Sequence, residues 1–394
     1  MRVAYFIEDY GQISETFVTQ LIHGLPSEDL NVRVFANKIH NNKVFNNPNS
    51  NLTVKETRFM ELNKFSIILA VLYGRIIRDI FSLSNLQKKV AEKKLKKFIE
   101  DYNPSVAYID FGNNSIIVRN ILKDYKIPYV VHFHGRDASQ LFGRKDYLHE
   151  IKIVYKEASR VIVASSHIKR RLILTGCPES KIVVVNLAFS SDKIPKCSWD
   201  YRKTIEPSIL SIGRLVEKKN PIALLYAFKL VKAKIKNAKL TIVGGGCMEE
   251  EVRSVCNELK IADSVQLKGE LPHYQALSEF RDNWIYALHC VTSSTGDQEG
   301  FNISIMEAGA SGMPCVSTLH DGIPDHVING ETGFLVPEYN YNAMAEKMIE
   351  LLSNPELCET MGMKAKKHYS TGYEVEKRVS KIRDILIKSG QNYG

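Results

Sequence analysis

Residues 287–318 read ALHCVTSSTGDQEGFNISIMEAGASGMPCVST, in the order strand, loop, helix, strand. The first part, Ala287–Thr292, and the last, Cys315–Ser317, are apolar runs typical of strands buried on both faces. Between them a glycine-bearing loop leads into a helix that we expect to begin at Phe301–Ile303. A helix that connects two such strands indicates a parallel sheet with helices on its faces.

The same order recurs along the chain in two series. One series of strands is predicted at Arg2–Ile7, Asn31–Asn37, Ser105–Asp110, Tyr129–His134, Arg160–Ser165 and Ile182–Asn186, and the other at Ile209–Ile212, Leu240–Val243, Ser264–Lys268, Ala287–Thr292, Cys315–Ser317 and Gly333–Val336. Helices separate the strands, for example Pro221–Lys234, which opens with proline at a favoured position. The pattern predicts two tandem, doubly wound α/β domains whose strand ends face a cleft, where such sheets bind ligands.

The length of 394 residues also fits two domains. Ser190–Pro207 is polar, contains two prolines and has no clear periodicity, so we expect the linker there. The predicted domains are therefore residues 1–190 and 208–372. A last helix, predicted at Tyr373–Lys388, either caps the second domain or crosses back to the first, and we group residues 373–394 with the first.

Composition restricts the partners and the compartment. The net charge of +9 favours an anionic partner, which includes nucleic acid, a phosphate-bearing small molecule and an anionic membrane. Seven cysteines without CxxC or zinc-ligand spacing indicate reduced thiols in a reducing compartment. The N-terminus reads as a strand, not as a signal peptide, and the longest apolar run, Ser66–Tyr73, is shorter than the ~20 residues that cross a bilayer. A cytoplasmic location is expected.

Glu299 and Glu307 stand eight positions apart, Glu299 in the predicted loop and Glu307 one to two turns into the helix. Both carboxylates can therefore point towards one ligand, and carboxylates accept hydrogen bonds from vicinal hydroxyls. The N–H groups at Phe301, Asn302 and Ile303, with the positive end of the helix dipole, suit a diphosphate. The alternative is two solvated glutamates at a helix N-terminus.

Three sequence blocks follow the two glutamates. They are Met313–Thr318, Gly322–Ile328 and Asn329–Pro337. With the two glutamates they resemble the signature of glycosyltransferase family four, an E-x7-E motif followed by GxPVV, GGxPE and xxGxTGxLV blocks. Two positions depart from that signature: Cys315 stands where valine is frequent, and His320-Asp321-Gly322 stands where a glycine pair is common.

The resemblance extends upstream to Ser211–Pro221, which is similar to the block vGRLvxxKG of the family. Arg214 and Lys219 match its diphosphate-binding arginine and lysine, and two cations can neutralise a leaving diphosphate without a metal. Val243–Gly246 resembles the glycine turn of the family, in which Gly245 is a candidate donor contact. A plain strand-to-helix turn is the alternative for those glycines.

In the first half, Tyr10–Val18 resembles the SETFV start of family members that build bacterial exopolysaccharides of the colanic-acid type. Gly11 lies in the glycine-containing acceptor or phosphate loop, and Ser14 is a candidate N-cap near the sugar. His132–Ser139 resembles the HGxD block, in which His134 matches the active-site histidine and Asp137 a sugar-proximal aspartate. By strand alternation we expect His132, two residues before His134, to be a packed core histidine.

A basic amphipathic stretch covers residues 65–97. Apolar residues of Phe65–Ser82 alternate with Arg75 and Arg78, and Gln87–Lys97 carries six lysines. Such a stretch can lie on an anionic membrane, or it can form helices packed on the first domain with solvated lysines.

The resemblance implies the GT-B fold and a retaining, metal-independent transfer of a hexose from a nucleotide diphosphate sugar, with a uridine diphosphate sugar as the expected donor. The acceptor is a hydroxyl of a saccharide or of a lipid-linked carrier, and neither cofactor nor metal is expected. In this interpretation His134, Glu299, Arg214 and Lys219 are catalytic, and Glu307 binds the ribose. The alternatives are a sugar-nucleotide epimerase of the same architecture and a degenerate binding scaffold. Nucleic-acid binding is not favoured, because the sequence contains no aromatic-basic module.

Overall fold

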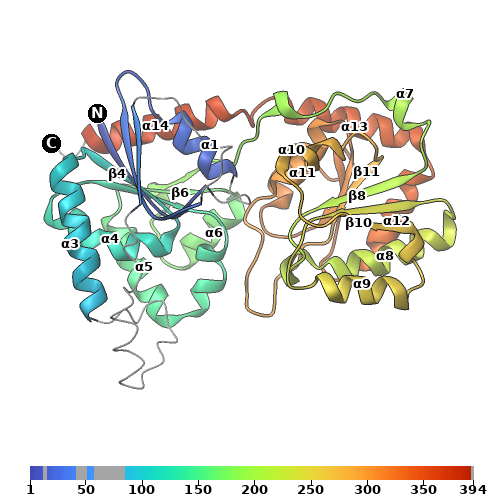
Figure 1. Ribbon diagram of the computed structural model, residues 1–394, viewed down its shortest axis with the longest axis horizontal. Helices are drawn as coiled ribbons and strands as arrows, with labels where there is room; N and C mark the ends of the chain where they lie inside the picture. Colours follow the sequence, from blue (N-terminus) through green and yellow to red (C-terminus); the bar gives the residue numbers. More distant parts are fainter. Residues whose placement is uncertain (12–15, 41–50, 57–84, 392–394) are drawn as a thin grey trace.

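Two parallel sheets form the framework of the protein in the computed structural model, which describes residues 1–11, 16–40, 51–56 and 85–391 (Figure 1). The first sheet has the strand order β3-β2-β1-β4-β5-β6-β7 and the second β10-β9-β8-β11-β12-β13. The strand pairings described in both sheets are parallel. The predicted fold class, two doubly wound Rossmann-like domains, is confirmed.

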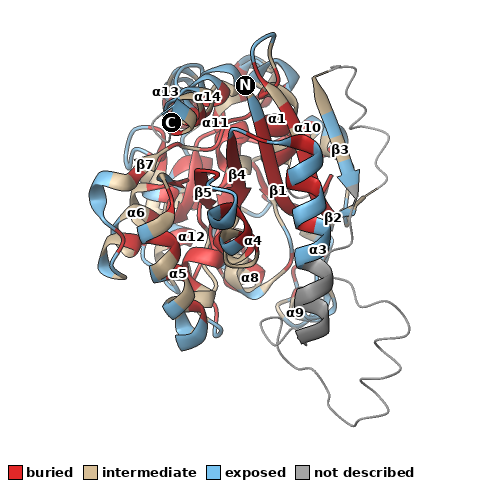
Figure 2. Cartoon of the chain, turned by 90° about the vertical axis from the view of Figure 1, so that its left-hand side faces the viewer, coloured by how far each residue is buried: buried red, intermediate tan, exposed pale blue. Residues whose placement is uncertain are grey.

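The first sheet is buried between helices, as its apolar strands predict. Its strands are β1 (Arg2–Tyr10), β2 (Asn31–Ile39), β3 (Leu52–Glu56), β4 (Val106–Asp110), β5 (Tyr129–Phe133), β6 (Arg160–Val163) and β7 (Ile182–Val184). The helices are α1 (Thr16–Gly24), α3 (Asn85–Tyr102), α4 (Gly112–Asp124), α5 (Lys145–Glu157) and α6 (Ser166–Leu174). Figure 2 shows β1 and β4 as buried strands, with exposed residues on the outer faces of the helices.

The second sheet repeats this architecture. Its strands are β8 (Ser208–Ile212), β9 (Lys239–Val243), β10 (Val265–Leu267), β11 (Ile285–Leu288), β12 (Cys315–Thr318) and β13 (Gly333–Val336). The helices include α8 (Pro221–Lys234), α9 (Glu249–Glu258), α10 (His273–Ser278), α11 (Ile303–Ala310), α12 (Tyr341–Leu352) and α13 (Pro355–Tyr369). The strand order reverses between β1 and β4 in one sheet and between β8 and β11 in the other, and ligands bind at such positions.

The predicted bounds differ most from the structure at one strand and at the linker, and one strand was missed. The strand expected at Ala287–Thr292 ends at Leu288, because the chain then turns so that Val291 N donates to Lys218 O at 2.9 Å. The second half of the predicted linker contains α7 (Trp199–Arg202), whose two end residues are buried. The Arg202 guanidinium donates to Gly312 O at 3.2 Å, so this segment packs into the second domain. The strand β3 was not predicted.

The C-terminal helix α14 (Val375–Gln391) crosses back to the first domain, which decides between the two predicted positions (Figure 1). The Arg378 side chain donates to Phe17 O at 2.7 Å, and the Arg383 side chain donates to Gly24 O at 2.8 Å. Ile382 and Leu386 are fully buried with the apolar residues of β1 and α1. The helix therefore connects the second domain to the first by packing and by side-chain hydrogen bonds to backbone carbonyls of α1.

Candidate active site

Loops from the two sheets meet at a contact that only glycine permits. A Cβ atom on Gly300 would lie 1.6 Å from the carbonyl oxygen of His134, and one on Gly322 would lie 2.2 Å from Gly300 O. Gly135 packs against the same loop, since its Cβ would be 3.3 Å from Gly300 N. The predicted HGxD and E-x7-E blocks, which come from different domains, are therefore in direct backbone contact.

The 3-10 turn Glu217–Lys219, which follows β8, holds the loop between β11 and α11. The Glu217 carboxylate accepts hydrogen bonds from the backbone N–H and the hydroxyl of Ser294, at 2.5 and 2.8 Å. The Lys218 ammonium pairs with Asp297 at 3.1 Å and donates to Gln298 O at 3.3 Å. Asp297 lies just outside the E-x7-E motif, and through this contact it helps to fix the loop that carries Glu299.

The third residue of the turn, Lys219, forms an ion pair with Glu299 at 2.8 Å, and the side chains are only 11% and 14% exposed. Burial alone raises the pKa of Glu299, but Lys219 and Lys218 outweigh it and lower that pKa to about 2. Burial likewise opposes the charge of Lys219, but Glu299 raises its pKa overall. Both groups are charged at neutral pH. Arg214, predicted beside Lys219, is exposed.

His320 fixes the backbone of Glu299. Its Nε2 accepts the Glu299 N–H at 3.0 Å, so its proton resides on Nδ1, which donates to Glu338 at 2.6 Å. The other oxygen of Glu338 accepts the Thr292 N–H at 2.9 Å. Burial lowers the pKa of His320, which keeps the ring neutral and in this tautomer. In the sequence, His320 stands out only as a departure from the family signature.

Helix α11 presents its N-terminus next to the ion pair. Asn302 is the N-cap, and its Oδ1 accepts the Ile305 N–H at 3.1 Å, while the earlier N–H groups at 301–303 have no intrahelical partner. Glu307 lies deeper in the helix, is 7% exposed and contacts His273 Nε2 at 2.8 Å. This hydrogen bond raises the pKa of His273. His273 was not found from the sequence.

The glycine turn after β9 supports the loop that carries Arg214. Gly244 has φ of 133°, and a Cβ there would lie 2.0 Å from Gly213 O. Leu215 N donates to Gly245 O at 2.8 Å. The turn is therefore required for this packing, and a donor contact by Gly245 stays a prediction.

In the first domain, backbone N–H groups occupy the carboxylate of Asp137. Its Oδ1 accepts N–H groups from His134 at 3.1 Å and Gly135 at 3.0 Å, and its Oδ2 accepts the Gly112 N–H at 2.8 Å. With 2% exposure, Asp137 organises the loop that holds His134, and its sugar-proximal position stays a prediction.

His134 lies at the carboxyl end of β5 and is 7% exposed. His132 is fully buried and bonded to Tyr108, as expected of a core histidine. Gly11, with φ of 82°, follows β1, while Ser14 lies outside the described residues.

Side chains of α6 complete the contact between the domains. The guanidinium of Arg171 donates to Gln298 Oε1 and to Ala138 O, the latter at 3.2 Å. Ser166 N donates to the carboxylate of Asp325 in the GIPD block. Ser166 and Arg171 were not predicted, because neither belongs to a motif of the sequence.

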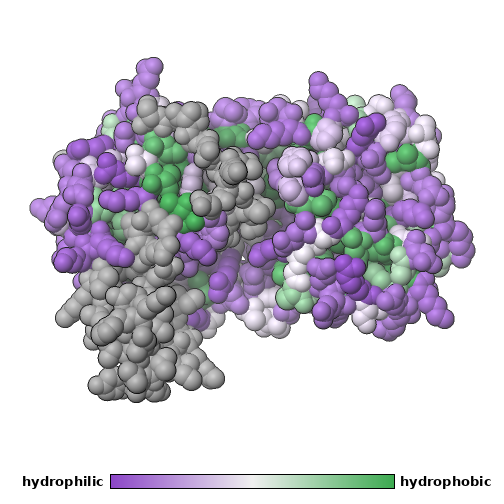
Figure 3. Space-filling model, in the orientation of Figure 1, coloured by the Kyte–Doolittle hydropathy of each residue, from purple (hydrophilic) through white to green (hydrophobic). Residues whose placement is uncertain are grey.

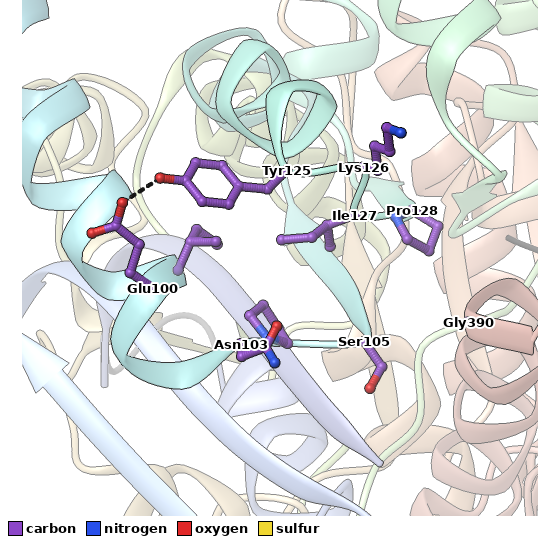
Figure 4. Close-up of a pocket in the computed structure, with 10 residues that line it drawn as sticks. Glu100, Asn103, Ser105, Tyr125, Lys126, Ile127, Pro128 and Gly390 are labelled. Atoms are coloured by element: carbon purple, nitrogen blue, oxygen red, sulfur yellow. Dashed lines mark hydrogen bonds between the residues drawn. The ribbon is translucent and has the colours of Figure 1, made fainter. Parts of the chain in front are cut away.

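A surface pocket of about 450 Å³ lies elsewhere, at the amino ends of β4 and β5 (Figure 4). Tyr125 closes one side through a hydrogen bond to Glu100. Sheets of this type bind ligands at the opposite edge, so we place the active site at the contact between the domains.

Asp321, beside His320, is a buried carboxyl whose two oxygens have no hydrogen-bond partner among the residues that the structure describes. Its φ of 43° is in the left-handed region, which asparagine and glycine tolerate better than most residues. Burial raises the pKa of Asp321 to about 8, and Arg171 offsets this only in part.

We expect Asp321→Asn to stabilise the protein increasingly as the pH rises from 4 to 8. The unfolded carboxyl loses its proton near pH 4 and the folded one near pH 8, so the wild type loses stability across this interval. The asparagine side chain does not titrate in this range, so the variant does not lose stability in this way. Urea unfolding should give similar free energies near pH 4 and a gap that grows by up to about 1.4 kcal/mol per pH unit. A gap that is constant with pH, or equal to that of the exposed-site control Asp263→Asn, would contradict the assignment.

The comparisons with known proteins agree with this geometry. Residues 14–192 match a family model described as Glycosyltransferase Family 4, and residues 199–368 match one described as Glycosyl transferases group 1. The chain is 29% identical over 222 residues to a candidate colanic acid biosynthesis glycosyltransferase of Salmonella typhimurium, which covers 55% of this chain and 53% of that protein. It is 28% identical over 237 residues to an amylovoran biosynthesis glycosyltransferase of Erwinia amylovora, with 59% and 58% covered. The matches thus span little more than half the length of these relatives.

Solved structures share the whole fold. Sucrose-phosphate synthase from Thermosynechococcus elongatus superposes with a TM-score of 0.79 at 17% identity over 98% of both chains. An Anabaena protein in complex with UDP gives a TM-score of 0.77 at 16% identity, with 98% of this chain and 100% of the other covered. The two family models together take in both sheets and both halves of the site, and the chain is similar to glycosyltransferase family four in its first half and to glycosyl transferases group 1 in its second.

Proposed function

We propose that the protein is a retaining, metal-independent glycosyltransferase that moves a hexose from a nucleotide diphosphate sugar to a hydroxyl acceptor. The observation that carries the proposal is the buried Lys219–Glu299 pair beside the N-terminus of α11. The cation and the free N–H groups can bind a diphosphate, and the carboxylate of the same loop system can accept hydrogen bonds from sugar hydroxyls.

In this mechanism Lys219, Arg214 and the N–H groups at 301–303 bind the diphosphate and stabilise its charge as it departs. Glu299 accepts hydrogen bonds from the transferred sugar, and Glu307 from the ribose. The bond from C1 of the sugar to the phosphate oxygen breaks, and the acceptor oxygen bonds to C1 on the same face. The departing phosphate takes the acceptor proton, so the proposal needs neither a metal nor a covalent enzyme intermediate.

The proposed acceptor is a hydroxyl group of a growing saccharide or of a lipid-linked carrier in bacterial surface polysaccharide synthesis. Its support is the naming of similar proteins for colanic acid and amylovoran biosynthesis. A uridine diphosphate sugar is the proposed donor, since one protein of the same fold was solved with UDP and with UDP-glucose.

A cytoplasmic location with peripheral contact to the inner face of an anionic membrane is also proposed. Within the described part of the chain, helices long and apolar enough to span a bilayer are absent. Hydrophilic side chains cover most of the described surface in Figure 3. Phe65–Ser82 lies outside the described residues, but α3 has exposed lysines at 93, 94, 96 and 97. Each cation near an anionic surface adds about 1 kcal/mol.

We expect the triple reversal Lys93→Glu, Lys96→Glu, Lys97→Glu to reduce sedimentation with vesicles that contain anionic lipid, and salt to weaken wild-type binding. The control reverses Lys364 and Lys367, which are exposed on α13 of the other domain. Equal binding by all three proteins would mean that α3 has only a structural role.

Transfer from UDP-glucose to a saccharide acceptor should be unchanged in excess EDTA, because side-chain cations and helix N–H groups replace the metal. Initial rates of nucleoside diphosphate release measure this. Loss of turnover that Mg²⁺ or Mn²⁺ restores would contradict the metal-free mechanism. Conversion of the donor without an acceptor would instead support an epimerase, and no turnover with a broad donor panel would support a binding scaffold.

Gly300→Ala should slow transfer by about 10²-fold. The added methyl group would collide with His134 O and separate the two halves of the site, and misplacement by about 1 Å can have this effect. Gly143→Ala is the matched control, because its Cβ would have no atom within 4 Å. An unchanged kcat for Gly300→Ala would show that closure at this contact is not required.

The two glutamates should respond differently to an isosteric change. Glu299→Gln should strongly reduce transfer but leave the affinity for free UDP equal or higher, because Lys219 loses its competing partner. Glu307→Gln should weaken both UDP and UDP-sugar, by the roughly 1.5–3 kcal/mol of a hydrogen bond to a charged group. Calorimetry and initial rates provide the measurement, with exposed Glu331→Gln as control. Similar behaviour of both variants would refute the assigned roles.

A further inference from the structure

Asp110, the last residue of β4, lies beside His134 at the end of β5. His134 Nε2 is 2.8 Å from Asp110 Oδ1, and Asp110 is fully buried. The strand register explains the contact, since Asp110 is paired with His132 and His134 follows two residues later. Nothing in the E-x7-E or HGxD motifs includes Asp110.

The second oxygen of Asp110 is also occupied, by the hydroxyl of Tyr5 on β1. Burial and the nearby Asp110 raise the pKa of Tyr5 well above its usual value, so Tyr5 remains a donor at neutral pH. Donors from two neighbouring strands thus hold the carboxylate in one orientation. An ionised carboxylate can only accept hydrogen bonds, so the proton on His134 must be on Nε2.

This tautomer leaves Nδ1 of His134 with a lone pair. Nδ1 is buried and has no hydrogen-bond partner among the described residues. A buried acceptor without a partner is unfavourable unless a ligand supplies a donor. Sugar hydroxyl groups are such donors, and His134 O already contacts the loop of Glu299 through Gly300.

Aromatic rings fix the plane of the His134 ring. Its centroid is 5.1 Å from that of Phe17, 4.8 Å from that of Phe111 and 4.0 Å from that of His132. Phe111, directly after Asp110, has φ of 66°, a conformation that is costly for a bulky side chain and is often found near functional sites.

We propose that Asp110 is a positioning residue, which holds His134 in the Nε2–H tautomer and directs Nδ1 to a hydroxyl of the reacting sugar. The proposal rests on the proposed function. A metal-binding role for the same residues is the alternative, because ligand atoms of Asp110, His132 and His134 lie within 4.8 Å of one another. The structure favours the hydrogen-bond role, since Tyr5 and Tyr108 already occupy the carboxylate and His132 Nδ1.

The test compares Asp110→Asn, His134→Ala and the double variant. Asp110→Asn should lower kcat by about 10–100-fold, the loss typical of a residue that orients another. UDP affinity by calorimetry should not change, and the double variant should be no slower than His134→Ala alone. Tyr102→Phe, which removes a hydroxyl that donates to Asn31 O at the start of β2, should leave kcat unchanged.

Nitrogen-15 NMR of His134 in the wild type tests the tautomer without any variant, and Tyr5→Phe offers a milder change if Asp110→Asn does not fold. We expect the Nε2–H form in the wild type, and a reduced kcat for Tyr5→Phe. An Nδ1–H form, or independent effects in the double variant, would overturn the proposal, as would bound zinc that Asp110→Asn loses. If His134→Ala alone slows transfer and Asp110→Asn does not, this inference fails and the proposed function stands. If neither slows transfer, the role of His134 in the proposed function fails as well.

Discussion

The buried ion pair between Lys219 and Glu299 is the interaction on which the rest of the site depends. Removing two charges from water is costly unless they are well paired and surrounded by further hydrogen bonds. Here the neighbours of Lys219 in its turn hold Ser294 and Asp297, and His320 holds the Glu299 backbone. The pair is thus charged and fixed before any ligand binds. In the proposed function, an incoming sugar diphosphate would offer each member a new partner, phosphate for the lysine and hydroxyls for the glutamate.

The same loop carries the contact between the domains, so donor binding and closure are physically connected. Gly300 follows Glu299 directly and packs on His134 O, while Gly322 packs on Gly300. Arg171 of the first domain reaches Gln298, and α14 returns from the second domain to α1. In this arrangement the first domain contributes His134 and its carboxylate partner, and the second contributes the diphosphate site. Neither half is complete without the other.

Much of this could be predicted from the sequence, because local patterns determine it. The bounds of Pro221–Lys234 and Gly333–Val336 agree with α8 and β13, and Lys219 and Glu299, which were predicted on loops after two different strands, lie together as an ion pair. His320, His273 and Asp110 could not be found in this way, since each acts on a residue of another element. The motif of Asp137 predicted a position near the sugar, but the sequence did not show that three backbone N–H groups occupy its carboxylate.

A double-mutant cycle of Lys219→Met and Glu299→Gln, followed by urea unfolding of the ligand-free protein, tests the central claim most directly. If the pair is buried and mutually stabilising, each single change should lower the free energy of unfolding by about 3–5 kcal/mol, because it leaves a buried charge without its partner. The double variant should then be clearly more stable than the sum of the two losses predicts. Additive losses, or single variants as stable as the wild type, would show that the two charges do not hold the site together.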